Sequence, residues 1–62
     1  MPLKVREMIK KLEADGWALA RMKGSHRQFV HPAKQGVVTI AGKLSADLPT
    51  GTERSILKQA GL

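Results

Sequence analysis

The sequence predicts an α+β fold in which two helices cover a three-stranded antiparallel sheet, in the order α-β-β-β-α. Three observations predict it: an amphipathic helical pattern near the N-terminus, three short strand-like runs between tight turns, and a second helical pattern at the end. Strands joined by short turns pair as an antiparallel meander, and helices on one of its faces produce two layers. We expect a single domain over residues 1–62.

The first helix is predicted over residues 4–14. The apolar side chains lie at the i, i+3, i+4 and i+7 spacing of one helical face. They are Val5, Met8, Ile9 and Leu12. Charged residues occupy the other faces. Asp15-Gly16 is expected to end the helix, because glycine readily adopts the left-handed conformation that closes a helix.

Three strands are predicted over residues 17–22, 26–31 and 37–40. Lys23-Gly24-Ser25 has the composition of a turn, as has the segment from Pro32 to Gly36. The first strand carries apolar residues on both faces, so each face is expected to be partly buried. One face has Trp17, Leu19 and Arg21, and the other Ala18, Ala20 and Met22. Trp17 is expected to be a core aromatic rather than a base-stacking one.

A loop over residues 41–49 is expected to lead into the second helix, over residues 51–60. Thr50 and Glu53 have the spacing of a capping box, in which both side chains accept hydrogen bonds from backbone N–H groups at the helix start. Ile56, Leu57 and Ala60 supply an apolar face, and Gly61 marks the end.

The composition is strongly basic. Lysine and arginine number 11 against 5 acidic residues, which gives a formal net charge of +6. This excess points to a polyanion such as a nucleic acid, or to an acidic protein partner. The alternative is that the charge serves only solubility.

Other composition features exclude several classes of protein. The chain has no cysteine, so it has no disulfide and no thiolate metal site. The longest apolar runs are too short for a membrane span, and the N-terminus lacks the apolar core of a signal peptide. We therefore expect a soluble, cytoplasmic protein that does not contact a membrane.

His26 is the candidate catalytic residue. It follows the Lys23-Gly24-Ser25 turn and stands beside Arg27 at the start of the second strand. Histidine is the side chain whose ordinary pKa allows proton transfer near neutral pH. Phe29 is expected in the core, so alternation along the strand directs His26 away from the helices. The alternative is an ordinary surface histidine that follows a turn.

The second histidine, His31, is expected to pack or to cap rather than to catalyse. Two histidines five residues apart, without a nearby acidic ligand, do not form a convincing metal site, so no metal or other cofactor is predicted. The sequence also contains no nucleophile elbow, glycine-rich phosphate loop or zinc pattern.

Basic side chains that could contact phosphate lie in turns, beside His26 and on the helices. Those in turns or near the histidine are Lys23, Arg27, Lys34 and Lys43, and those on helices are Lys10, Lys11 and Lys58. Each alone is more often a solvated charge. Together they could neutralise several phosphates, and each contact would add to the salt dependence of binding.

Two segments of the sequence resemble the HicA family of bacterial toxins, the YcfA-like mRNA interferases. The first contains Glu13-Ala14-Asp15-Gly16-Trp17, Lys23-Gly24-Ser25-His26-Arg27-Gln28-Phe29 and His31-Pro32. The second contains Asp47-Leu48-Pro49-Thr50-Gly51-Thr52 and Ser55-Ile56-Leu57-Lys58-Gln59-Ala60-Gly61-Leu62. The resemblance covers nearly the entire chain and rests on the combination of the two segments.

This resemblance implies a double-stranded-RNA-binding-like fold and a type II toxin that cleaves mRNA as a metal-independent endoribonuclease. It implies a hetero-oligomer with a HicB antitoxin that covers the active site. The family's catalytic histidine corresponds to His26, as general base or acid. Many relatives carry further histidines where this chain has Arg27 and the segment Ala41–Ser45, so only His31 is left as a second proton-transfer group.

The residues predicted to bind RNA surround His26 in the sequence. They are Lys23, Gly24, Ser25, Arg27, Gln28 and Lys43. Lys23 and Arg27 would stabilise charge on the transition state, and the backbone N–H groups of the turn would hold a phosphate oxygen. Arg27 faces away from His26 in a regular strand, so its role depends on a bulge or twist.

Two other functions remain open at this point. One is a non-catalytic RNA-binding module of the same fold, which would not need His26. The other is a protein-interaction module whose basic face binds an acidic partner. The first would bind RNA and the second a protein, and neither would cleave RNA. A cleavage assay therefore distinguishes both from the enzyme.

Overall fold

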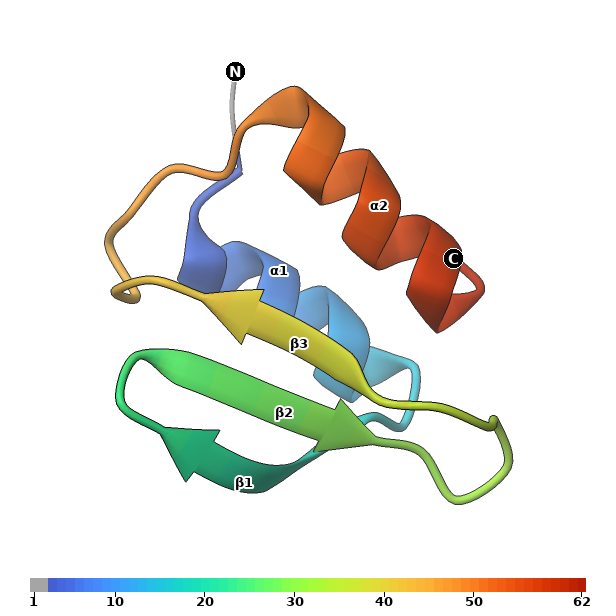
Figure 1. Ribbon diagram of the computed structural model, residues 1–62. Coiled ribbons are helices and arrows are strands. Elements are labelled where there is room, and N and C mark those ends of the chain that lie inside the picture. The colour runs from blue at the N-terminus through green and yellow to red at the C-terminus, as the bar shows by residue number, and fades with distance from the viewer. Residues whose placement is uncertain (1–2) are drawn as a thin grey trace.

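The computed structural model describes residues 3–62 and has the predicted α+β element order (Figure 1). The elements are α1 (Val5–Ala14), β1 (Ala18–Lys23), β2 (His26–Val30), β3 (Val38–Ala41) and α2 (Thr50–Ala60). The strands pair antiparallel in the order β1-β2-β3, so β2 is central. Each boundary lies within one residue of its predicted position. The first two residues of the predicted domain lie outside the described range.

The helices lie on one side of the sheet and along one of its edges. Figure 1 shows α1 behind the sheet and α2 beyond the β3 edge, with β1 at the opposite edge. The buried core is formed by Val5, Met8, Leu12, Trp17, Phe29, Val38, Ile40, Leu48, Ile56 and Ala60. The predicted core positions of Trp17 and Phe29 are confirmed, since their exposed fractions are 2% and 1%. Within residues 3–62, neither helix has the length and apolar character needed to cross a bilayer.

The predicted capping box at the start of α2 is wrong. The N-cap residue is Pro49, which is extended and makes no side-chain cap bond. Its carbonyl already accepts the Glu53 N–H at 2.9 Å, so Thr50 lies inside the helix and its hydroxyl is not in the cap position. A related contact occurs at α1 instead, where the Glu7 carboxylate accepts the Lys4 backbone N–H at 3.2 Å.

The prediction of two partly buried faces on β1 is also wrong, because every residue of this strand is exposed. The strand contains a bulge: Leu19 pairs with Phe29 and Arg21 pairs with Gln28, which leaves Ala20 between them without a partner on β2. The bulge separates Leu19 and Arg21, which were expected on one face. Leu19 is on the face of buried Phe29, and Arg21 is on the opposite face. Neither helix covers β1, so Leu19 remains 50% exposed.

Candidate functional site

A two-residue turn places His26 at the first position of β2. Gly24 has a φ of +59°, and no described residue other than glycine has a positive φ. A positive φ at the first central position alone is typical of a type II′ turn, which suits the twist of a hairpin. Lys23 and His26 flank the turn and pair directly across the strands. Their Cβ atoms are therefore about 5 Å apart, so the Lys23 ammonium group can reach the surroundings of the imidazole.

His26 belongs to the face of the sheet that points away from the helices. Along β2, His26 and Gln28 alternate with Arg27 and buried Phe29. The neighbouring strands extend this surface in two cross-strand rows, which we call the open face: Lys23, His26 and Ala41 in the first row, and Arg21, Gln28 and Thr39 in the second. His26 is exposed, which confirms its expected direction. The open face contains two cations and no carboxylate.

Lys43 lies at the same end of the sheet as His26. It follows Ala41, the partner of His26 on β3, by two residues. The Gly42 N–H donates a hydrogen bond to the Ser25 carbonyl at 3.1 Å, so the β1–β2 turn and the segment after β3 are joined. Lys23 and Lys43 thus bring two exposed ammonium groups to the end of the sheet that carries His26.

Arg27 lies on the helix side of the sheet, where it pairs with buried Ile40. Its Nη1 donates a hydrogen bond to the Gly42 carbonyl at 2.8 Å. The one irregularity recorded between the strands is in β1, not in β2, so nothing in the register turns Arg27 toward the open face. The structure therefore separates Arg27 from the other predicted RNA-binding residues and connects it to the segment that carries Lys43.

His31 stands five residues from His26, about 16 Å along the strand direction, and both of its ring nitrogens are occupied. Nδ1 accepts the backbone N–H groups of Ala33 and Lys34 at 2.9 and 3.1 Å. Nε2 lies 2.6 Å from the Asp15 carbonyl oxygen, so it carries the proton and donates it. The ring also packs edge-on against Trp17, with 5.3 Å between the centroids. The expectation that His31 is a packing or capping residue is confirmed.

Lys34 joins the same cluster as His31. Its Nζ lies 2.5 Å from Asp15 Oδ2 and donates a hydrogen bond to the Ala60 carbonyl at 2.9 Å. These contacts keep Lys34 away from the basic surface around His26. The hydrogen bond from Lys34 lowers the pKa of the Asp15 carboxyl below its ordinary value of 3.8, and the charge of the Lys34 ammonium acts in the same direction. Desolvation opposes them.

Gly16 makes the close approach of His31 possible. Its φ is +103°, and a Cβ atom at this position would lie 2.7 Å from His31 Nε2. Sequence reasoning explained Gly16 only as the end of the first helix. Its contact with His31 has no signal in the local sequence, because the two residues meet only when β2 pairs with β1.

The open face is shallow, and residues 3–62 enclose no pocket. Within this part of the chain, no three His, Cys, Asp or Glu side chains come together in a group that could hold a metal ion. A ligand on this face would lie across the sheet and contact the side chains that project from it. An extended single strand has the shape that such a surface accepts.

Two comparisons with known proteins found similar proteins. Residues 5–62 match the model of the HicA toxin of bacterial toxin–antitoxin systems. A solved structure described as a toxin–antitoxin complex from Streptococcus pneumoniae contains a chain that is 42% identical, with a TM-score of 0.79. The alignment covers 98% of this chain and 100% of that one. A comparison with curated proteins found no match.

Proposed function

This chain belongs to the HicA toxin family, and we propose that it is a metal-independent endoribonuclease that cleaves mRNA with His26. The observation that carries the proposal is an exposed imidazole paired with Lys23 on a carboxylate-free sheet face. RNA contains its own nucleophile, the 2′-hydroxyl. The protein has only to orient the backbone, move a proton and stabilise charge, and the residues around His26 supply these three functions.

In the proposed reaction, a ring nitrogen of His26 takes the proton of the 2′-hydroxyl as general base. The 2′ oxygen bonds to phosphorus while the bond between phosphorus and the 5′ oxygen breaks. The products are a 2′,3′-cyclic phosphate and a 5′-hydroxyl, whose proton comes from water. His31 has no part in this step, because its two nitrogens are held by Asp15 and by the loop after β2.

The negative charge on the phosphate grows in the transition state, and cations placed in advance stabilise it. In the proposal, Lys23 and Lys43 supply these cations from the end of the sheet that carries His26. The backbone N–H groups of Gly24 and Ser25, at the exposed tip of the turn, are further candidates for a phosphate oxygen. We assign Arg27 an indirect part: its bond to the Gly42 carbonyl positions the segment that carries Lys43.

We further propose that a HicB-type antitoxin binds the toxin over the open face. The family model is that of a toxin of toxin–antitoxin systems, and the similar solved structure is a toxin–antitoxin complex. A chain of net charge +6 with exposed cations around its site favours an acidic partner. Such a partner would compete with RNA for the same lysines.

The test is incubation of the purified protein with a defined mRNA in metal-free buffer, beside His26→Ala. The parent should leave 2′,3′-cyclic phosphate ends, and the variant should cleave about 10²- to 10⁴-fold more slowly. Circular dichroism should show equal folding, because His26 is exposed. An added HicB-type antitoxin should stop cleavage by the parent.

Two outcomes would contradict the proposed reaction, and a third would contradict the proposed antitoxin site. Equal cleavage by His26→Ala would remove the histidine from the reaction. RNA binding without cleavage by the parent would favour a non-catalytic RNA-binding module. Cleavage that continues at saturating antitoxin would contradict the covering of the open face and would leave the reaction itself intact.

A further inference from the structure

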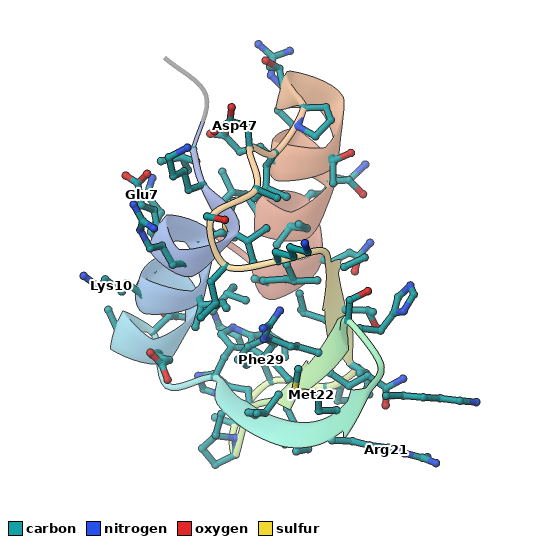
Figure 2. All side chains as sticks on the ribbon, turned by 90° about the vertical axis from the view of Figure 1, so that its left-hand side faces the viewer. Glu7, Lys10, Arg21, Met22, Phe29 and Asp47 are labelled. Carbon is teal, nitrogen blue, oxygen red and sulfur yellow. The ribbon has the colours of Figure 1, made fainter. Side chains whose placement is uncertain are left out.

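The bulge in β1 adds a cation to the open face that the sequence pattern does not predict. In a regular strand, Leu19, Arg21 and Lys23 would share one face. Because Ala20 is extra, Leu19 instead opposes buried Phe29, while Arg21 and Lys23 remain together on the other face. Figure 2 shows the Arg21 side chain extending away from the helices. Bulges are frequent beside active sites, where they redirect a side chain.

Arg21 is the β1 residue of the second row of the open face, next to the row that contains His26. Gln28 lies between Arg21 and Thr39 across the three strands, and it is partly buried while its two neighbours are exposed. The row offers a guanidinium fork, an amide and a hydroxyl, which together can bind a phosphate and the donors and acceptors of a sugar or base.

The spacing of the two rows fits a nucleic-acid backbone. Adjacent positions on one face of a strand are two residues, or about 7 Å, apart. Successive phosphates of an extended single strand are separated by a similar distance. If one phosphate lies at His26 and Lys23, the next phosphate along the strand therefore reaches Arg21.

We propose that Arg21, Gln28 and Thr39 form a subsite for the nucleotide next to the cleaved bond. Arg21 binds the phosphate of that nucleotide, and Gln28 and Thr39 form hydrogen bonds with its sugar and base. The two aromatic residues of the chain, Trp17 and Phe29, are buried in the core. The subsite thus holds its nucleotide without stacking, so its base preference is weak. This assignment rests on the proposed endoribonuclease activity.

The test compares two substrates that have the same cleavable bond. One is a ribodinucleotide, and the other is a tetranucleotide with a single ribose at that bond and deoxyribose elsewhere. Arg21→Gln should raise the KM of the tetranucleotide about tenfold and reduce the preference for it over the dinucleotide by a similar factor. Tetranucleotide binding should also lose about 0.7 from its log–log salt slope.

Arg54→Gln is the matched control, because it removes the same charge from an exposed position on α2. It should leave both substrates unaffected. Equal KM changes in the two variants, or an unchanged tetranucleotide KM in Arg21→Gln, would overturn the subsite and leave the proposed function standing. If Arg21→Gln weakened antitoxin binding but changed neither KM, the subsite would also be overturned. A parent protein that cleaves neither substrate would overturn the proposed function, and the subsite with it.

Discussion

The two histidines of the chain lie at the start of β2 and directly after its end, and they differ in almost every physical respect. His26 is exposed, pairs with Lys23 and lies on the open face. His31 has a side chain only 10% exposed, packs against Trp17, and has both ring nitrogens occupied by backbone groups. The comparison shows that two histidines five residues apart can lie in opposite environments: one ring is exposed to a ligand, and the nitrogens of the other are already held by the fold.

The end of the sheet near His31 is held together by the polar contacts of Lys34. Asp15, Lys34 and Ala60 connect the end of α1, the loop after β2 and the end of α2. A 62-residue chain has little core with which to stabilise itself. These polar contacts join three elements at the His31 end of the layers, while the residues at the His26 end are exposed.

The largest effect on stability should come from adding a side-chain atom where the His31 ring packs against Gly16. Gly16→Ala introduces a Cβ atom 2.7 Å from His31 Nε2, at a φ of +103°. The ring cannot move without breaking three hydrogen bonds. We expect the free energy of unfolding to fall by about 2–3 kcal/mol in urea denaturation.

Gly51→Ala is the control for this substitution. Gly51 lies in α2, has no positive φ, and has nothing within 4 Å of an added Cβ. It should stabilise the protein by up to about 1 kcal/mol, since alanine is the better helix former. Equal stability changes in the two variants would contradict the account of His31 as a tightly packed side chain.

A smaller effect should appear in the pH dependence of stability. The pKa of Asp15 is lowered in the folded protein, chiefly by the hydrogen bond from Lys34. The ion pair therefore stabilises the fold above the ordinary pKa of 3.8, and this contribution is lost as the pH falls through the folded-state pKa. In Lys34→Gln, an NMR titration of the Asp15 carboxyl should show its pKa rise toward the ordinary value.

Lys58→Gln removes the same charge from an exposed position on α2 and should leave the Asp15 titration unchanged. If Lys34→Gln also left it unchanged, the contact between Lys34 and Asp15 would not be the cause of the lowered pKa. The acid-induced loss of stability should then be the same in the parent protein and in Lys34→Gln.

Local patterns were enough to predict most of the fold. The helical spacing from Val5 to Leu12, the Gly24-Ser25 turn and the single Phe29 each report on short-range geometry, and each element was found within one residue of its predicted bounds. The direction of His26 followed from alternation about Phe29. The bulge at Ala20 could not be predicted, because it is a feature of the pairing between β1 and β2, and the local sequence of β1 does not indicate that pairing.

The candidate site was less predictable than the fold, since its side chains are positioned by residues distant in sequence. Arg27 binds the Gly42 carbonyl, and Lys34 binds Asp15 and the end of α2. Nothing near either residue distinguishes it from a solvated cation such as Lys23. Arg21 is the reverse case, a cation that sequence reasoning did not include among the phosphate contacts but that lies on the open face. A regular strand would have placed it on the same face as Leu19, toward the helices.

The most direct test of the account is one substitution made at both histidines. His26→Asn and His31→Asn should be compared for RNA cleavage and for urea unfolding at low temperature. The account predicts that His26→Asn loses at least about 10²-fold in cleavage rate while its unfolding free energy stays within about 0.5 kcal/mol of the parent's. His31→Asn should keep its cleavage rate but lose about 1–2 kcal/mol of stability. Loss of cleavage in a folded His31→Asn, or full activity in His26→Asn, would contradict the assignment of the two histidines.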